Sequence, residues 1–244
     1  MKYLIFNFAL TTLTITTSSG NFPEEAWGSR YWNDVSRATT YVESQTPGLI
    51  VEPPPEDDSV TTTSELEYLK SLAQSRQPGD IILIHKENLD PLKRFFQVLD
   101  VSRKDVPKLD TLIRRIAQKS YLPILYFKNK YSRIRPYQLD TDLLTVIDGP
   151  PHPSYPSGHA TQGYLVASIL AELFPAGDLR NSQVMELGKG IGTRREIAGV
   201  HYPSDTAAGV ALAKQLKPIL MNDPEFQQAF EAAKSEIFSI QQSP

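Results

Sequence analysis

Apolar residues recur every three or four positions along most of the chain after residue 64, which is the spacing of one face of an α-helix. Ser64 begins the first such stretch as an N-cap, with Glu67 three residues on. Gly79 is expected to end that helix, and a short strand is predicted at Ile81–Ile84. Further helices are predicted over residues 105–133, 156–174, 178–200, from 203 onward and over 224–240.

Proline and glycine are expected to disturb two of these helices. Pro123 lies inside the longest one and should kink or divide it, because proline lacks an amide hydrogen and clashes with the preceding turn. Gly188, Gly190 and Gly192 should loosen the helix that contains them. The sequence has no repeat of fixed period. The pattern therefore predicts an all-α fold, a single-domain bundle of six to eight helices over residues 64–244.

The chain before residue 64 has a different character. Residues 1–19 begin with Lys2, continue as an apolar stretch and end in small residues, which is the layout of a secretory signal peptide. A buried first strand or helix is the alternative. Residues 20–63 are rich in Pro, Ser and Thr, and we expect an extended segment with polyproline II character around Pro53–Pro55. The predicted location of the mature protein is periplasmic or secreted.

Composition limits the chemistry that is open to the chain. It has 244 residues, a formal charge of −3, no cysteine and four histidines. Without cysteine there is no disulfide, thiol nucleophile or thiolate metal site. The slightly acidic balance argues against a nucleic-acid partner. Beyond the leader, no apolar stretch approaches the roughly 18 residues that a membrane-spanning helix needs, so no membrane span is expected.

The first chemically suggestive cluster is Lys128, followed seven residues later by Arg135 and then Pro136. Seven residues amount to nearly two helical turns, so both cations can point the same way. Lysine supplies a point charge, and arginine supplies a planar fork that matches phosphate oxygens. The alternative is a solvated basic face, to which Lys130 and Arg133 would also belong.

The second cluster is Tyr155-Pro156-Ser157-Gly158-His159. With Pro156 at the first position of a helix, the following amide groups are free to bind an anion, and Gly158 lets a ligand approach the backbone. Ser157 adds a hydroxyl donor, and His159 adds a group that exchanges protons near neutral pH. An ordinary helix cap beside a packed histidine is the alternative interpretation.

The third cluster combines Arg195, His201 and Asp205. Pro203 marks a helix start, so Asp205 can accept a hydrogen bond from one imidazole nitrogen of His201 and fix its tautomer. The other nitrogen then carries a free lone pair. A local His–Asp hydrogen bond that only caps the helix is the alternative.

In this order, the three clusters resemble the motifs of the acid phosphatase superfamily that includes type 2 phosphatidic acid phosphatases and vanadium haloperoxidases. Within it, the chain looks most similar to the bacterial class A non-specific acid phosphatases. The resemblance extends to Pro53–Pro55 and to the tail Asn222–Gln228, so it spans most of the chain after the leader. Two features depart from the family. Some relatives have cysteines, and Arg194 stands where the family usually has serine, so it either alters local hydrogen bonding or places a further cation near the phosphate.

The resemblance implies a metal-independent acid phosphatase, a phosphoric monoester hydrolase with no cofactor. It implies His201 as the nucleophile that forms a phosphohistidine, Asp205 as the group that orients it, and His159 as general acid and then base. The implied phosphate-binding residues are Lys128, Arg135, Ser157, Gly158 and Arg195. Because His201 must be neutral and His159 protonated, we predict a bell-shaped pH profile with a mildly acidic optimum.

Other functions stay open at this point. A vanadium-dependent haloperoxidase would hold vanadate in the same pocket, with His201 as its ligand. An acyl hydrolase using Ser157, His201 and Asp205, a metal site at His159, His201 and Asp205, and a phosphate-binding module without turnover are further alternatives. As an acid phosphatase, the protein would take small-molecule phosphomonoesters, would be inhibited by inorganic phosphate or vanadate, and would form a homo-oligomer as relatives do.

Overall fold

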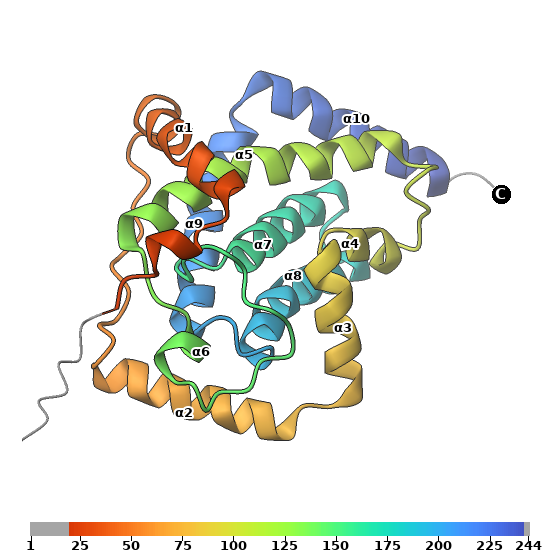
Figure 1. The fold of residues 1–244 in the computed structure, drawn as a ribbon. Coiled ribbons are helices and arrows are strands. Elements are labelled where there is room, and N and C mark those ends of the chain that lie inside the picture. Colours follow the sequence, from red (N-terminus) through yellow and green to blue (C-terminus); the bar gives the residue numbers. More distant parts are fainter. Residues whose placement is uncertain (1–19, 242–244) are drawn as a thin grey trace, which may run out of the picture.

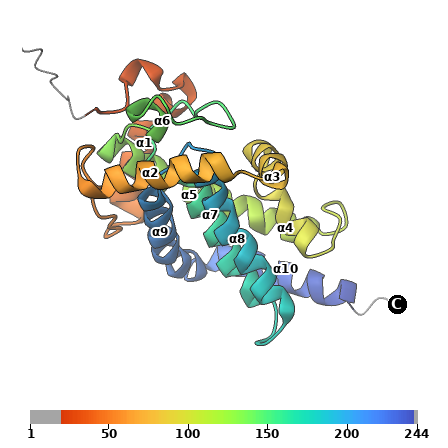
Figure 2. The same ribbon diagram turned by 90° about the horizontal axis from the view of Figure 1, so that it is seen from below.

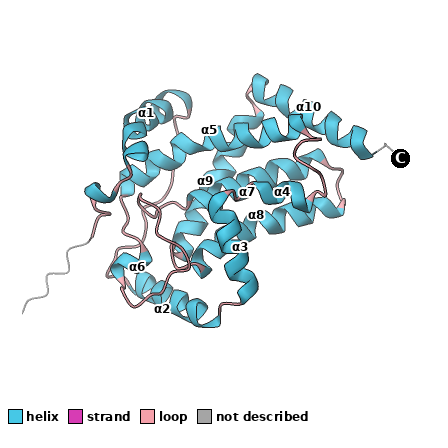
Figure 3. Ribbon diagram, turned by 45° about the vertical axis from the view of Figure 1, so that its right-hand side comes forward, coloured by secondary structure: helices cyan, strands magenta, loops and turns pink. Residues whose placement is uncertain are grey.

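The computed structural model describes residues 20–241, which fold into a bundle of helices (Figure 1). No strand occurs among these residues, as Figure 3 shows, and the all-α prediction is confirmed. The described part of the chain has ten α-helices, eight of them seven residues or longer. They are α1 (Ser29–Gln45), α2 (Val60–Ser75), α3 (Pro78–Leu89), α4 (Lys93–Val98), α5 (Pro107–Tyr131), α6 (Pro136–Leu139), α7 (Gly158–Leu170), α8 (Leu179–Ile197), α9 (Pro203–Met221) and α10 (Pro224–Gln241), with 3₁₀ helices at Glu24–Ala26 and Ala171–Leu173.

Helix α7 lies at the centre of the bundle, in contact with α5, α8 and α9. Its side chains at Leu165, Val166, Ile169 and Leu170 are completely buried. A helix that is apolar around most of its circumference is stable only when other helices surround it. Helix α10 packs along the outer side of α5, and Figure 2 shows α2 running across the bundle, where it contacts α8.

Glycines allow α7 to lie unusually close to its neighbours. A Cβ atom at Gly188 of α8 would be 2.4 Å from Cβ of Ala167 and 2.6 Å from the carbonyl oxygen of Gly163, both on α7. A Cβ atom at Gly209 of α9 would be 2.7 Å from the carbonyl oxygen of Ser157. These distances are below van der Waals contact, so only glycine fits. The prediction that glycine loosens α8 is wrong: α8 is continuous, and Gly188 is a packing contact.

The first two helices after residue 58 differ from the prediction. Helix α2 begins at Val60 instead of Ser64, because Ser59 is its N-cap and accepts a hydrogen bond from the Thr62 amide at 3.1 Å. The predicted strand at Ile81–Ile84 is wrong, since these residues lie within α3. A short apolar run does not by itself distinguish a buried strand from a helix.

The structure contradicts the expected division of a helix at Pro123 and the expected helix start at Pro156. Helix α5 continues through Pro123 without division. Its neighbours Leu125 and Phe127 are buried, and this packing offsets the loss of one backbone hydrogen bond. Pro156 does not open α7 but precedes it, and Ser157 is the N-cap.

The segment before α2 is only partly extended. The prediction of an extended chain over residues 20–63 is wrong for α1, whose apolar residues, three or four positions apart, face α5. Pro53–Pro55 has no regular secondary structure, as expected. The Tyr155 hydroxyl donates to the Glu52 carbonyl at 2.6 Å, and the Tyr131 hydroxyl donates to the Val51 carbonyl. These two hydrogen bonds attach the segment to the bundle.

Some predictions concern parts or properties that the structure does not test. The predicted signal peptide, residues 1–19, lies outside the described residues, so the leader and export stay predictions. The homo-oligomer also stays a prediction. Across residues 20–241, no helix combines the length and the apolar character needed to cross a membrane.

The close packing of α7 and α8 yields a stability prediction. Gly188→Ala should lower the free energy of unfolding by about 1–3 kcal/mol, because the added methyl group overlaps α7. Denaturant titration followed by circular dichroism measures this change. Gly79→Ala in α3 is the matched control, since nothing lies within 4 Å of its added Cβ and stability should not fall. Equal stability of Gly188→Ala and the parent protein would contradict this account.

Candidate active site

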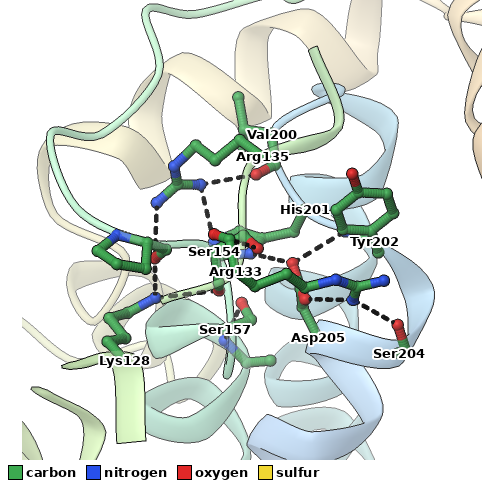
Figure 4. A network of polar contacts seen from close by, with 12 residues as sticks. Lys128, Arg133, Arg135, Ser154, Ser157, Val200, His201, Tyr202, Ser204 and Asp205 are labelled. Atoms are coloured by element: carbon green, nitrogen blue, oxygen red, sulfur yellow. Dashed lines mark hydrogen bonds and ion pairs between the residues drawn. The ribbon is translucent and has the colours of Figure 1, made fainter. Parts of the chain in front are cut away.

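The predicted site residues come together where four helix ends meet. Figure 4 labels Lys128, Arg135, Ser157, His201 and Asp205 among them. Lys128 lies in the last turn of α5 and Arg195 in the last turn of α8. Helix α7 contributes its cap and first residues, and α9 contributes Asp205 from its first turn. Arg135 and His201 come from the intervening loops. The structure therefore brings together all eight residues that are predicted to act in catalysis or phosphate binding.

Asp205 holds the imidazole of His201. Its Oδ2 accepts hydrogen bonds from Nδ1 of His201 at 2.9 Å and from the Tyr202 amide at 3.0 Å. Burial opposes ionisation of Asp205, but the charge of Arg133 and the hydrogen bonds from His201 and Tyr202 together outweigh burial, and the pKa of Asp205 falls to about 2. The anionic Asp205 keeps the imidazole proton on Nδ1, which leaves the lone pair on Nε2. Burial, reinforced by Arg135 and opposed by Asp205, lowers the pKa of His201 to about 3, so its ring is neutral.

Backbone carbonyl groups hold the two cations of the first cluster. Nζ of Lys128 donates to the carbonyls of residues 153–154, at 2.7 and 3.0 Å. Arg135 donates from Nη1 to the Val200 carbonyl at 2.6 Å and from Nε to the His152 carbonyl at 3.0 Å. Burial lowers the pKa of Lys128 well below its usual value and that of Arg135 to about 10. Both side chains are buried, so the alternative of a solvated basic face does not apply to them.

The start of α7 presents a histidine to the site. Ser157 caps the helix, and its Oγ accepts a hydrogen bond from the Ala160 amide at 3.3 Å. Nε2 of His159 is buried and has no hydrogen-bond partner among residues 20–241. Burial first, and then the charge of Arg195, lower the pKa of His159 to about 3. His159 therefore presents a neutral ring beside several cations.

Arg195 is held against α3. Its Nη2 donates to the Ile84 carbonyl at 3.0 Å. Its Nε and Nη1 are buried, and neither has a partner in the part of the chain that the structure describes. Buried donors without a partner are costly unless a ligand satisfies them. Two N–H groups of Arg195 are therefore available to an anion.

Arg194, the departure from the family, is paired within the protein. Its Nε donates to Oε2 of Glu87 at 2.7 Å, and its Nη2 lies 2.7 Å from Oε1. Glu87 is completely buried and also pairs with Arg94 at 2.5 Å, while Nη2 of Arg195 lies 3.9 Å away. For Arg194 the structure therefore favours altered local hydrogen bonding over a further cation beside the phosphate. The partner in this bonding is Glu87 of α3.

Three buried charged residues at the site, Glu65, Glu87 and Arg133, are not assigned by the sequence. Arg133 is only 4% exposed, and its Nη1 donates to Oδ1 of Asp205 at 2.8 Å. In the sequence Arg133 and Lys130 look like equal members of a basic face, yet Lys130 is exposed. The only sequence signal for Arg133 is its position two residues before Arg135.

A cavity of about 200 Å³ opens onto the site. Part of its lining consists of the predicted residues Lys128, Gly158, His159 and His201. The rest comes mainly from α1, α5 and α7, and includes Arg30, Tyr31, Tyr121, His152 and Gln162. The rings of Tyr31 and His152 meet edge to face, with centroids 4.7 Å apart.

Known proteins with similar sequences have related activities. The family model described as the PAP2 superfamily matches residues 116–222. An acid phosphatase of Zymomonas mobilis is 31% identical over 218 residues, which covers 82% of this chain and 78% of the relative. A non-specific acid phosphatase of Providencia stuartii is 29% identical over 150 residues, or 57% of each chain.

Similarity of fold reaches further than similarity of sequence. The crystal structure of a bacterial vanadium-dependent iodoperoxidase matches with a TM-score of 0.58 and 17% identity, and the match covers 70% of this chain and 52% of that one. At this identity the likeness concerns the fold alone. The family match and the similar sequences, by contrast, identify the family. The chain belongs to the PAP2 superfamily and, within it, to the class A non-specific acid phosphatases, and it is therefore a phosphoric monoester hydrolase.

Proposed function

We propose that this phosphatase works through a phosphohistidine at Nε2 of His201 and needs no metal ion. The His201–Asp205 hydrogen bond is the observation that supports this best, because it leaves a neutral imidazole with a lone pair beside a cavity that Lys128 and Arg30 also line. In the first step Nε2 attacks phosphorus, the bond to the leaving-group oxygen breaks, and that oxygen takes a proton from His159. In the second step His159 removes a proton from water, whose oxygen attacks phosphorus and releases inorganic phosphate and free His201.

Fixed positive charges stabilise the phosphoryl group in this proposal. The groups that hold its oxygens are the side chains of Lys128, Arg135, Arg195 and Ser157 and the amide of Gly158. Nη1 of Arg135 lies 3.5 Å from Nε2 of His201, next to the attacking atom. Because backbone carbonyls already hold Lys128 and Arg135, little reorganisation is needed when charge develops.

His159 has to gain a proton before it can act as general acid. Burial lowers the pKa of His159 to about 3, and Arg195 is the strongest charge that acts in the same direction. A phosphate dianion bound between Arg195 and Lys128 would offset their repulsion of the imidazolium and raise the pKa of His159. Substrate binding and protonation of His159 are therefore coupled in the proposed mechanism.

The wall formed by α1 and α5 is proposed to receive the leaving group. Tyr31 and Tyr121 line the cavity without belonging to the phosphate-binding set, and Arg30 lies beside them. Aromatic rings and a guanidinium group suit a small planar leaving group. A cavity of about 200 Å³ favours small phosphomonoesters as substrates.

Removal of the nucleophile tests the mechanism directly. His201→Ala should lower kcat for 4-nitrophenyl phosphate at about pH 5–7 by about 10⁴-fold or more, whereas the parent enzyme should keep full activity in EDTA. His85→Ala, at an exposed position of α3, is the control and should stay within about twofold of the parent enzyme. Parent-level activity in His201→Ala would exclude this nucleophile. Loss of activity in EDTA would favour a metal site, and vanadate-dependent bromination without phosphatase activity would favour a haloperoxidase.

The two histidines predict opposite limbs of the pH profile. As pH falls, His201 gains a proton and loses its nucleophilic lone pair; as pH rises, His159 in the complex loses the proton that it must donate. Measurement of kcat between about pH 3 and 9 should therefore show a bell with a mildly acidic optimum. His159→Ala should remove the alkaline limb and lower kcat by about 10²–10⁴-fold. Activity that still rises at pH 9 would contradict these roles.

The leaving-group wall predicts a selective loss of affinity. Tyr31→Ala should raise KM for phenyl phosphate by about 3–10-fold, because a ring contact is lost. Competitive inhibition by inorganic phosphate or vanadate should change less than about twofold, since neither has a leaving group. Tyr68→Ala, at an exposed tyrosine of α2 outside the cavity, is the matched control. An equal loss of phosphate inhibition would assign Tyr31 to the phosphate side.

A further inference from the structure

We propose that Arg133 and Glu65 are positioning residues that act through Asp205 to set the orientation and proton affinity of the attacking His201. This inference rests on the proposed phosphohistidine mechanism and adds two groups that the three motifs do not contain. Neither residue lines the active-site cavity, so any effect on the reaction must pass through Asp205 or its neighbours.

The two oxygens of Asp205 have different partners. Oδ2 accepts from His201 and from the Tyr202 amide, whereas Oδ1 accepts from Nη1 of Arg133 at 2.8 Å. The same Nη1 donates to Oγ of Ser204 at 2.7 Å (Figure 4). Because Arg133 holds one oxygen of the carboxylate, rotation that would turn the other oxygen away from His201 is opposed.

Arg133 is in turn fixed by its surroundings. Its guanidinium carbon lies 3.8 Å from the centroid of the Tyr202 ring, which is a stacked cation–π contact. Glu65 of α2 completes the arrangement. Its Oε1 and Oε2 accept from the amide and hydroxyl of Ser204 at 2.6 and 2.8 Å, and Oε2 lies 3.4 Å from Nη2 of Arg133. A planar fork meets these partners at once, and a lysine would not.

Arg133 also controls how strongly Asp205 attracts the imidazole proton. Arg133 is the strongest charge that keeps Asp205 ionised. Without it, Asp205 would be more basic and would stabilise the imidazolium form of His201 more strongly. The nucleophile would then be protonated at higher pH. The other titratable or charged groups that surround His201 and Asp205 are Lys128, Arg135, His152, Tyr155, Glu196 and Tyr202.

The test is a kinetic comparison of Arg133→Gln, Arg133→Lys and Glu65→Gln with the parent enzyme. Arg133→Gln should lower kcat for 4-nitrophenyl phosphate by about 10–100-fold, since misplaced groups cost rates of this size. KM and inhibition by inorganic phosphate should change less than about threefold, and the acid limb should move to higher pH by about 0.5–1 unit. In Arg133→Lys the acid limb should lie close to that of the parent enzyme, because the positive charge is kept. Its kcat should stay below that of the parent enzyme, because lysine lacks the planar fork. Glu65→Gln, which keeps a Ser204 partner, should cost about 2–5-fold in kcat.

A double-mutant cycle separates positioning from mere structural support. In a background of Asp205→Asn, the further change Arg133→Gln should cost less than about twofold, because its target is already gone. Arg114→Gln, at an exposed arginine that pairs with Asp110 on α5, is the matched control and should leave kcat and the pH profile unchanged.

Three results would overturn this inference. The first is an additive loss of kcat in the double-mutant cycle. The second is weaker inhibition of Arg133→Gln by inorganic phosphate while its kcat is unchanged. The third is an Arg133→Gln variant whose kcat and acid limb both equal those of the parent enzyme. If Arg133→Gln does not fold, Arg133→Lys and Glu65→Gln decide by the same readouts. An active His201→Ala variant would instead overturn the phosphohistidine mechanism itself.

Discussion

The buried carboxylate of Asp205 is the interaction on which the rest of the active site depends. An ionised carboxylate removed from water is strongly destabilising unless charged and hydrogen-bonding partners replace the water. Here Arg133, His201 and the Tyr202 amide provide those partners. They come from the loop after α5 and from the start of α9, so the arrangement exists only when the bundle has assembled. The contact that orients His201 is therefore also one that the fold must satisfy in order to bury Asp205.

The buried cations at the site are under the same constraint as Asp205: a charge removed from water is destabilising unless partners replace the water. Lys128, Arg135 and Arg195 are buried close together, which burial and mutual repulsion both disfavour. Backbone carbonyls hold each of them, and two N–H groups of Arg195 still lack a partner among the described residues. In the proposed mechanism a phosphate dianion bound among these cations offsets their repulsion, and the fixed cations are the preorganised electrostatic environment that phosphoryl transfer requires.

Two outer helices support the site from different sides. On the Asp205 side, α2 supplies Glu65, which binds the start of α9. On the Arg195 side, α3 supplies the Ile84 carbonyl and the Glu87 carboxylate, to which Arg194 is paired. Arg194 is thus paired with a buried carboxylate within the fold, which it shares with Arg94. In Figure 1, α2 and α3 lie at the edge of the bundle, away from α10.

The sequence by itself determined the all-α class and the starts of α9 and α10 at prolines, and it singled out the eight candidate site residues, because these depend on local spacing and on side-chain chemistry. It did not reveal α1, whose apolar face is diluted by Ser and Thr, and it assigned Ile81–Ile84 to a strand because a short apolar run suits either element. The tertiary structure alone decided that Arg133 and Glu87 are buried partners of the site. Burial and pairing arise between residues 72 to 107 positions apart in the chain, and no local pattern records which cation turns inward.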